Sequence, residues 1–356
     1  MKKLTAALLG STGAVGQRYI SMLERHPFIK LDVLMGGRSA GGNYGQSARW
    51  LQADAIPEEF AAKKVLASVP ESARGCDVVF SALPAAAAAA IEPKFAMSGF
   101  SVISEASAHR MDQDVPLVVP EINPEQLGII EVQKRRRKWK GSLVTTPNCT
   151  ATGLVMVMKP LLDRFGLARA IVTSMQAVSG AGFPGVPSLL ITENVIPYIK
   201  DEEEKVVAES RKILEHPVEG GMRHPGIEIA ISCNRVPVID GHTETLYGEF
   251  PGAVEPDEVA DSLSAFRGLP QKLRLPSAPE QPIIIRDEPD RPQPRLDRLS
   301  GSVPGMSVVV GRVRRGIGDN SVQLTLVSHN TIRGAAGTAI LTAELMQNQG
   351  YLGRPG

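Results

Sequence analysis

The sequence predicts an α/β protein of two domains, the first built on a parallel sheet and the second an α+β domain with a mixed sheet. A chain of 356 residues is longer than one hydrophobic core usually serves. Strand-like and helix-like runs alternate through residues 1–148. Runs with strand-like β-branched content follow at residues 227–232, 245–250, 307–312 and 322–328. We therefore expect one domain over residues 1–148 and another over residues 149–333.

A glycine-rich turn follows the first strand. The apolar run Leu4–Leu9 leads into Gly10, Ser11, Thr12, Gly13, Ala14, Val15 and Gly16, after which apolar residues recur at helical spacing. Such glycines let the backbone approach a pyrophosphate, which the helix N-terminus then favours electrostatically. We expect a Rossmann-type dinucleotide-binding domain with residues 10–16 on the cofactor. The GxxGxxG spacing differs from the commoner GxGxxG, and a plain tight turn is the alternative.

The end of the second strand indicates which dinucleotide binds. Lys30–Met35 is followed by Gly36, Gly37, Arg38 and Ser39. An acidic residue here would bond the ribose 2′-hydroxyl of NAD, whereas a guanidinium and a hydroxyl suit a 2′-phosphate. We therefore expect NADP(H) as cofactor, bound by Arg38 and Ser39. An exposed loop arginine is the alternative.

Further strands are expected at residues 65–70, 77–84 and 101–104. Open α/β sheets bind ligands at the carboxyl ends of their strands, so we assign Ser81 and Leu83 to the cofactor site as well. The alanine-rich stretch Ala85–Ala90 predicts a helix start, because Ala is the strongest helix former. The basic run Lys134–Lys138 is typical of a solvated helix face.

A cysteine lies at the centre of the most informative stretch, Thr145–Gly153. Pro147 and the small and apolar residues after Cys149 predict the first turns of a buried helix, where unpaired N–H groups would converge on the sulfur. Helix N-termini and neighbouring cations lower cysteine pKa values from about 8.5 to roughly 3.5–7.5, and the thiolate is the nucleophile. The alternative is a buried structural cysteine.

Composition excludes several classes of function. The net charge of +1 provides no field that would attract nucleic acid or a membrane surface, and a small-molecule partner is expected instead. No apolar run approaches the roughly 20 residues of a membrane span. The three cysteines lack CxxC pairing and metal-ligand spacing, so neither a disulfide framework nor a metal site is indicated. We expect a cytoplasmic protein.

Four motifs together resemble the aspartate-β-semialdehyde dehydrogenase family, most closely its archaeal and fungal branch. They are the GxxGxxG turn, the segment Pro147–Thr150, Gln176 placed 27 residues after Cys149, and Arg235 placed seven residues before His242. The resemblance covers essentially the whole chain. It implies that the second domain forms a homodimer or homotetramer, and that the C-terminal helix within residues 334–356 returns to the first domain.

The resemblance also implies roles for individual residues. Cys149 resembles the acyl-forming nucleophile, His242 the general acid/base, Gln176 the substrate-orienting amide, Arg235 the arginine that grips the substrate carboxylate, Glu202 the carboxylate that meets its amino group, and Lys205 and Arg110 the phosphate-binding cations; Ser179, Gly180 and Asn330 are expected on the cofactor. The choice of Glu202 over Glu203 and Glu204 depends on an ExxK spacing that places Glu202 and Lys205 on one helix face.

One residue departs from the family pattern. Glu105 stands before the Ala-Ser-Ala-His-Arg segment, where the family leads us to expect an asparagine. A carboxylate at this position would compete with phosphate for Arg110.

The expected reaction is the NADPH-dependent reduction of L-aspartyl 4-phosphate to L-aspartate 4-semialdehyde, with release of phosphate. A thiolate must displace the phosphate, because a thioester accepts hydride readily while it holds the acyl group. Two alternatives remain open. One is a malonyl-CoA reductase of the same architecture, whose substrate lacks an amino group for Glu202. The other is a non-catalytic NADP-binding protein.

Overall fold

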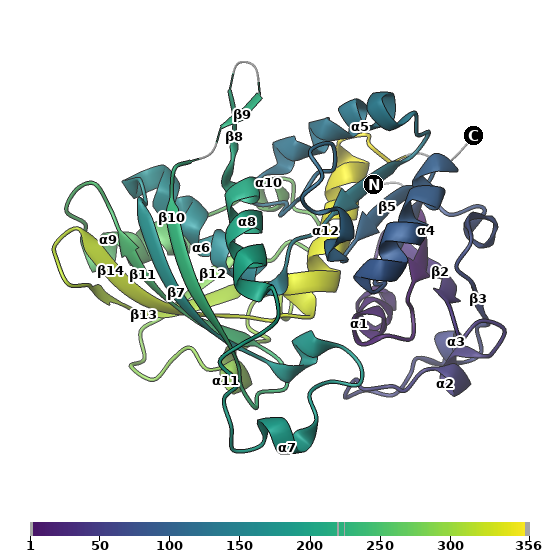
Figure 1. Ribbon diagram of the computed structural model, residues 1–356, viewed down its shortest axis with the longest axis horizontal. Coiled ribbons are helices and arrows are strands. Elements are labelled where there is room, and N and C mark those ends of the chain that lie inside the picture. Colours follow the sequence, from purple (N-terminus) through teal and green to yellow (C-terminus); the bar gives the residue numbers. More distant parts are fainter. Residues whose placement is uncertain (1–2, 219–220, 224, 353–356) are drawn as a thin grey trace. The chain divides into compact units, whose positions relative to one another are not determined.

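The computed structural model describes residues 3–218, 221–223 and 225–352, which divide into two compact units (Figure 1). The first unit comprises the chain up to Val118, residues Pro124–Pro147 and the chain from Ala335 onward. The second unit comprises Val119–Asn123 and Asn148–Gly334. The short segment Val119–Asn123 has no counterpart in the sequence-based division, which assigned these residues to the first domain. In the described residues, no helix combines the length and apolarity that crossing a membrane requires.

A parallel six-stranded sheet forms the centre of the first unit, in the order β3-β2-β1-β4-β5-β6. All its neighbouring pairs run parallel. The order reverses between β1 and β4, as it does in doubly wound dinucleotide-binding sheets. The Rossmann-type prediction is confirmed. The strands are β1 (Leu4–Leu9), β2 (Ile29–Gly36), β3 (Val65–Ala67), β4 (Val78–Ser81), β5 (Ser101–Ser104) and β6 (Ser142–Thr145).

Helices connect these strands, and the side chains of β4, β5 and β6 are buried throughout. Strands covered on both faces read as largely apolar runs, which is why the sequence located β4 and β5. Strand β6 was not among the expected strands. The alanine-rich stretch begins α4, and the basic run ends α5 with Arg135 and Arg136 exposed, both as predicted. The helices are α1 (Ala14–Leu23), α2 (Tyr44–Ser47), α3 (Glu58–Ala61), α4 (Ala85–Met97), α5 (Ile129–Arg137) and α12 (Gly337–Asn348), with 3-10 turns at Pro70–Ala73, Ser107–His109 and Pro124–Gly128.

The turn between β1 and α1 leaves no room for a side chain at Gly10 or Gly16. Gly10 has a φ of +73°, and a Cβ built there would lie 2.6 Å from the carbonyl oxygen of Ala82, just beyond β4. A Cβ on Gly16 would lie 2.4 Å from the Gly10 oxygen. Helix α1 begins after Gly13 with no side-chain cap and no acidic residue in its first turn. Its first N–H groups therefore suit an external anion.

The second unit is built on a mixed six-stranded sheet in the order β10-β7-β11-β14-β13-β12, as the sequence predicted. Strand β7 runs parallel to β10 and antiparallel to β11. The strands are β7 (Arg169–Gln176), β10 (Glu228–Arg235), β11 (His242–Glu249), β12 (Ile283–Arg286), β13 (Val308–Arg315) and β14 (Ser321–Ser328), and a hairpin pairs β8 (His216–Val218) with β9 (Gly221–Arg223). The predicted runs 227–232 and 245–250 were too short, because β10 extends to Arg235 and β11 begins at His242.

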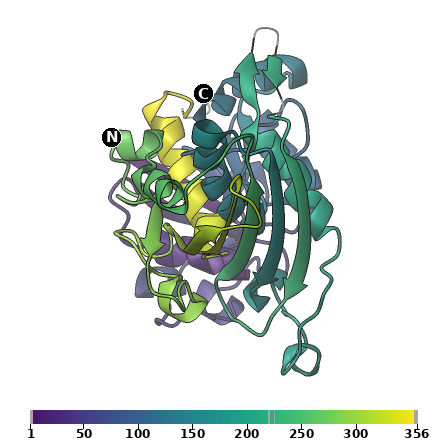
Figure 2. The same ribbon diagram turned by 90° about the vertical axis from the view of Figure 1, so that its left-hand side faces the viewer.

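One face of this sheet is covered by helices and the other is open. Along β7 the residues alternate between exposed and buried, and Ile171 on the open side is 48% exposed. Figure 2 looks towards these teal and green strands. On the covered side α6 packs against α8, α9 and β14. The helices are α6 (Cys149–Phe165), α7 (Ser188–Ile191), α8 (Glu202–Leu214), α9 (Pro256–Ala265), α10 (Leu269–Lys272) and α11 (Pro294–Asp297), with a 3-10 turn at Val178–Ala181 and a π-helical turn at Ile332–Ala336.

The glycine turn generates a stability prediction. Gly10→Ala places a methyl group against the Ala82 carbonyl in a left-handed conformation, so it should lower the free energy of unfolding by at least about 1–3 kcal/mol. Gly37→Ala is the matched control, because a Cβ at Gly37 meets nothing within 4 Å. Denaturant unfolding of both variants checks the prediction. Equal stability of the two variants would contradict it.

Candidate active site

Cys149 is the first residue of α6, and Asn148 caps the helix in front of it. The Asn148 Oδ1 atom accepts hydrogen bonds from the N–H groups of Thr150 at 2.8 Å and Ala151 at 3.2 Å. The sequence had predicted unpaired N–H groups at this helix start, and for these two groups that prediction is wrong. Asparagine is among the strongest N-cap residues, and its oxygen takes the donors before any ligand does.

Helix α8 holds the capping residue from the other side. The backbone N–H of Asn148 donates to Glu209 Oε2 at 2.6 Å, and its Nδ2 donates to Glu202 Oε1 at 2.9 Å. Backbone and side chain of Asn148 are thus both tied to carboxylates of α8. These contacts fix the chain direction immediately before Cys149.

The sulfur of Cys149 lies against an imidazole. The distance between Cys149 Sγ and His242 Nε2 is 3.1 Å. The other ring nitrogen, Nδ1, accepts a hydrogen bond from the backbone N–H of Ala177 at 3.0 Å. A nitrogen that accepts cannot also carry a proton, so the neutral ring carries its proton on Nε2. His242 therefore presents an N–H donor to the sulfur.

The surroundings of His242 keep the ring uncharged. The side chain is fully buried. Burial, together with the positive charge of the nearby Arg235 and the effect of His329, lowers the pKa of His242 to about 3. A neutral imidazole with its proton on Nε2 can donate a hydrogen bond to a developing oxyanion and stabilise its charge.

Arg235 and Gln176 are neighbours across paired strands. They lie opposite each other at the ends of β10 and β7. Arg235 donates from Nη1 to the carbonyl oxygen of Ala177 at 2.8 Å, and Gln176 donates from Nε2 to Ser174 Oγ at 3.2 Å. Burial lowers the pKa of Arg235, while the nearby Cys149 and Glu202 act in the opposite direction. The guanidinium thus belongs to the same cluster as the sulfur.

The structure separates the three consecutive glutamates at the start of α8. Glu202 bonds to Asn148 beside the sulfur, Glu203 accepts from the backbone N–H of Cys233 at 2.9 Å, and Glu204 is exposed. Lys205 lies 3.9 Å from Asp201 and is partly exposed. Of the three carboxylates, Glu202 is the one that contacts Asn148, the residue before Cys149.

Three residues predicted on the cofactor lie in the second unit. Asn330 donates from Nδ2 to Ser179 Oγ at 2.8 Å and accepts from the N–H of Gly241 at 2.9 Å. A Cβ on Gly180 would lie 3.1 Å from Arg235 Nη1 and 3.4 Å from a ring carbon of His242. Gly180 is therefore close to the Arg235 and His242 side chains, and Asn330 links Ser179 to the residue before His242.

The remaining cofactor candidates lie at the carboxyl edge of the first unit's sheet. Residues 10–16 follow β1, Arg38 and Ser39 follow β2, and Ser81 and Leu83 lie at and after the end of β4. These three strands are adjacent in the sheet. Arg38 is exposed, whereas the Ser11 hydroxyl is buried and donates to the Met35 carbonyl at 3.1 Å. The uncapped α1 N-terminus and the glycine-rich turn fit a dinucleotide pyrophosphate.

Arg110 and Glu105 lie in the first unit. Arg110 donates from Nη2 to the backbone oxygen of Glu105 at 2.6 Å. The Glu105 carboxylate accepts from the Tyr19 hydroxyl at 2.6 Å and from the Thr146 hydroxyl at 2.7 Å. Burial raises the pKa of Glu105, against the effect of these hydrogen bonds and of Arg110. Two hydroxyl groups thus hold the Glu105 carboxylate, and Arg110 bonds the backbone oxygen of the same residue.

Two family models match the chain. "Semialdehyde dehydrogenase, NAD binding domain" matches residues 5–130, and "Semialdehyde dehydrogenase, dimerisation domain" matches residues 158–333. The aspartate-semialdehyde dehydrogenase of Archaeoglobus fulgidus is 50% identical and aligns with 97% of this chain and 98% of its own. This chain belongs to the aspartate-semialdehyde dehydrogenase family. It has an NAD(P)-binding domain and a dimerisation domain.

Two further comparisons bear on family membership. The crystal structure of the Candida albicans aspartate-semialdehyde dehydrogenase with NADP has a TM-score of 0.88 at 38% identity and covers 98% of this chain and 99% of that one. A malonyl CoA reductase (NADP) of Metallosphaera sedula is 42% identical and covers 99% of each chain. The alternative foreseen from sequence thus has a real counterpart among relatives.

Sequence reasoning missed the groups that hold Cys149 and His242 in place. They are the cap oxygen of Asn148, the carboxylate of Glu209 and the backbone N–H of Ala177. The Asn148 cap had a local signal, since an asparagine directly before a helix start is a recognised N-cap. Glu209 and Ala177 had none, because they lie 61 and 65 residues from their partners along the chain.

The tautomer of His242 can be tested directly. Its ring ¹⁵N shifts should report a neutral Nε2–H form that does not titrate between about pH 8 and about pH 5, where an ordinary histidine would. Below about pH 6.5 the unfolded chain protonates this histidine while the folded chain does not. Through His242, the free energy of unfolding should therefore decrease as the pH falls from about 6.5 towards the folded pKa of about 3.

The signals of His242 are identified by their loss in His242→Asn. A ring that gains a proton near pH 6.5, or that carries its neutral proton on Nδ1, would contradict the prediction.

Proposed function

We propose that the chain catalyses the NADPH-dependent reduction of L-aspartyl 4-phosphate to L-aspartate 4-semialdehyde with release of phosphate. The observation that carries this proposal is the cluster in which Cys149 Sγ lies 3.1 Å from Nε2 of the buried His242, with Arg235 and Gln176 at the adjoining strand ends. Family membership supports it.

Cys149 acts as the nucleophile. Its sulfur forms a bond to the acyl carbon, and the bond from that carbon to the phosphate oxygen breaks, so that phosphate leaves with its electron pair. The Nε2–H of His242 donates to the sulfur before attack. A donor in this position stabilises the thiolate, which is the reactive form.

NADPH, when bound, supplies the hydride that reduces the thioester carbonyl. His242 then lies where its Nε2 proton can stabilise the oxyanion on that carbon, in a water-poor site where such donors count most. Collapse of the adduct releases the aldehyde and returns the electron pair to the Cys149 sulfur. Because Nδ1 is occupied by the Ala177 N–H, Nε2 is the nitrogen that serves the reaction.

Two side chains suit the other end of an aspartyl substrate. The Arg235 guanidinium can hold a carboxylate with two parallel hydrogen bonds, and Glu202 can meet an ammonium group. Gln176 is assigned to orienting the acyl group. Lys205 and Arg110 remain predictions for phosphate binding. Ser179, Gly180 and Asn330 remain predictions for cofactor binding, together with the first-unit residues described above.

The open sheet face of the second unit is proposed as the subunit contact of a homodimer or homotetramer.

A malonyl-CoA reductase is the second candidate, because one relative bears that name at 42% identity. Malonyl-CoA has a carboxylate for Arg235 but no amino group for Glu202. The contact of Glu202 with Asn148 keeps an acceptor beside the nucleophile, which favours an amino-acid substrate.

The acyl acceptor decides between the two candidates. In the reverse direction, with semialdehyde and NADP⁺, we expect NADPH formation to require phosphate or arsenate. A requirement for coenzyme A would instead support the second candidate. Cys149→Ser should lose at least about 10⁴-fold in turnover while cofactor affinity stays nearly unchanged. Cys76→Ala, a buried cysteine of the first unit, should keep turnover. Substantial turnover by Cys149→Ser would exclude the thioester route.

Cofactor preference is tested at Arg38. Loss of a charge-assisted contact with the 2′-phosphate should weaken NADPH binding by about 10- to 100-fold in Arg38→Ala, and leave NADH binding nearly unchanged. Arg74→Ala, which removes another exposed arginine of the first unit, is the control. Fluorescence titration with both dinucleotides gives the affinities. Equal losses for NADPH and NADH would remove the basis for the assigned preference.

A further inference from the structure

A buried ion pair lies in the second unit, close in the chain to a residue that contacts the nucleophile. Arg333 donates from Nη1 to Glu121 Oε1 at 2.9 Å and from Nη2 to Oε2 at 2.7 Å. Both side chains are 0% exposed. The same Nη2 lies 2.9 Å from the sulfur of Met156 in α6. The guanidinium therefore connects the segment Val119–Asn123 to the helix that begins with Cys149.

The residue after Arg333 lies directly against Cys149. A Cβ built on Gly334 would lie 2.5 Å from the Cβ of Cys149 and 2.9 Å from its Cα. Real Cβ atoms do not approach this closely, so only glycine allows the backbone to pass here. The N–H of Gly334 also donates to the carbonyl of His329 at 3.0 Å. The backbone at Gly334 thus packs directly against the Cα and Cβ atoms of Cys149.

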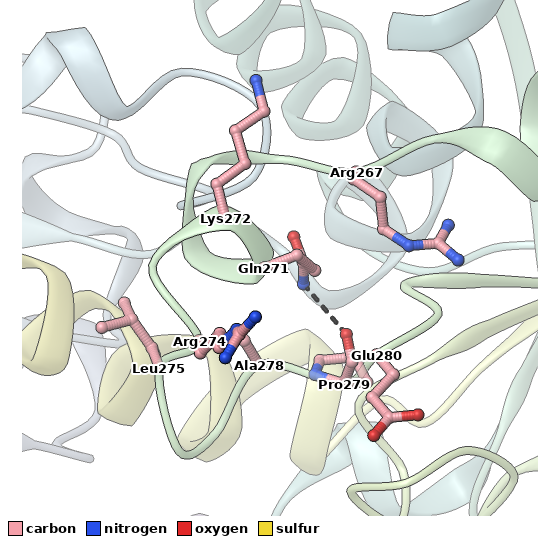
Figure 3. Close-up of a pocket in the computed structure, with 8 residues that line it drawn as sticks. All are labelled: Arg267, Gln271, Lys272, Arg274, Leu275, Ala278, Pro279 and Glu280. Carbon is pink, nitrogen blue, oxygen red and sulfur yellow. Dashed lines mark hydrogen bonds between the residues drawn. The ribbon is translucent and has the colours of Figure 1, made fainter.

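Glu121 is supported on its far side. Gln271 donates from Nε2 to Glu121 Oε1 at 3.3 Å and to the Pro279 carbonyl at 3.2 Å, the latter drawn in Figure 3. A Cβ on Gly268 would lie 2.6 Å from the Cα of Glu121, so this backbone is tightly packed. Gln271 lines a cavity of about 510 Å³ whose lining includes no predicted site residue. The contacts therefore run from this cavity through Glu121 and Arg333 to Gly334.

Stability alone is a poor explanation for such a pair. Desolvating two charges costs several kcal/mol per ion, and apolar residues of similar volume often serve stability as well or better. A bidentate guanidinium–carboxylate pair does, however, fix two segments in orientation as well as in distance. The segment fixed here is the one that touches Cys149, one residue after the arginine.

We propose that Glu121 and Arg333 are positioning residues, which hold the backbone at Gly334 against Cys149 and thereby set the sulfur relative to His242. The proposal rests on the proposed function only in taking Cys149 as the nucleophile. Both side chains are fully buried, and neither belongs to the residues assigned to the substrate or the cofactor. Its effect is on where the sulfur lies, and that can be measured without turnover.

Iodoacetamide alkylation of the full-length protein measures the placement of Cys149. The two other cysteines are buried, and burial raises the pKa of each to about 12, so they should react slowly. The rate is followed by mass spectrometry across a range of pH, together with Tm and with kcat and KM for the semialdehyde. Arg333→Lys keeps the charge but not the fork geometry of the contact.

For Arg333→Lys we expect kcat to fall by about 10- to 100-fold with KM changed less than about threefold, since a displaced nucleophile loses alignment more than binding. The pH profile of alkylation should shift as the sulfur moves from His242. Arg137→Lys is the matched control, because Arg137 makes a bidentate contact with Asp114 in the first unit. It should lower Tm but leave both alkylation and kcat unchanged.

The double variant Glu121→Gln with Arg333→Met separates stability from positioning. It removes both buried charges, so Tm should recover relative to Arg333→Met alone while kcat and the alkylation profile stay altered. Gly334→Ala, which acts without touching the ion pair, should alter alkylation in the same way.

Unchanged alkylation and kcat in Arg333→Lys and in the double variant, at a lowered Tm, would show a purely structural pair and overturn the proposal. Absence of any fast-reacting thiol in the wild type would instead contradict the proposed function. The two failures are therefore distinguishable.

Discussion

The pairing of β7 with its two neighbours is the constraint on which the candidate site depends. The parallel register with β10 places Arg235 opposite Gln176, and the antiparallel register with β11 begins one residue away, where Thr243 faces Met175. Gln176, Arg235 and His242, from distant parts of the sequence, thus lie at the same end of three adjacent strands. A slip of one residue would turn the side chains of a strand to the opposite face. Along β7, such a slip would move the buried Val172 and Gln176 to the open face and turn the exposed Arg169 towards the helices.

The same strand end also determines the chemistry of the imidazole. Ala177 directly follows β7, and its two backbone groups have different partners. Its N–H donates to His242 Nδ1 and its carbonyl accepts from Arg235. One peptide segment therefore selects the tautomer of the His242 ring and anchors the Arg235 guanidinium. An imidazolium at this position would face Arg235 and would lose the hydrogen bond from Ala177, so the neutral ring is favoured on both counts.

The sequence located what local patterns determine. The glycine turn was predictable because Gly10 and Gly16 occupy positions that no side chain can enter, and the helix at Cys149 because its residues are small and apolar after a proline. Arg235 and His242 were recognised by their family spacing, whereas their place at the strand ends was missed, since periodicity fades where polar residues end a strand. The partners of Asn148 and Arg333 could not be predicted at all. Glu209 and Glu121 come from segments 61 and 212 residues away, and only the folded chain brings them to these positions.

Two arginines in the described part of the second unit are buried, and they differ in whether a carboxylate neutralises the guanidinium. Arg333 is 0% exposed and its guanidinium is matched by a carboxylate, so it has little capacity for an external anion. Arg235 is 7% exposed, and within the described residues no carboxylate lies within ion-pair distance of it; its bond is to a backbone carbonyl. A buried cation without a counter-ion is costly, and that cost falls when a ligand supplies the missing charge. The fold thus keeps one guanidinium without a carboxylate partner near the Cys149 sulfur, which agrees with the carboxylate-binding role proposed for Arg235.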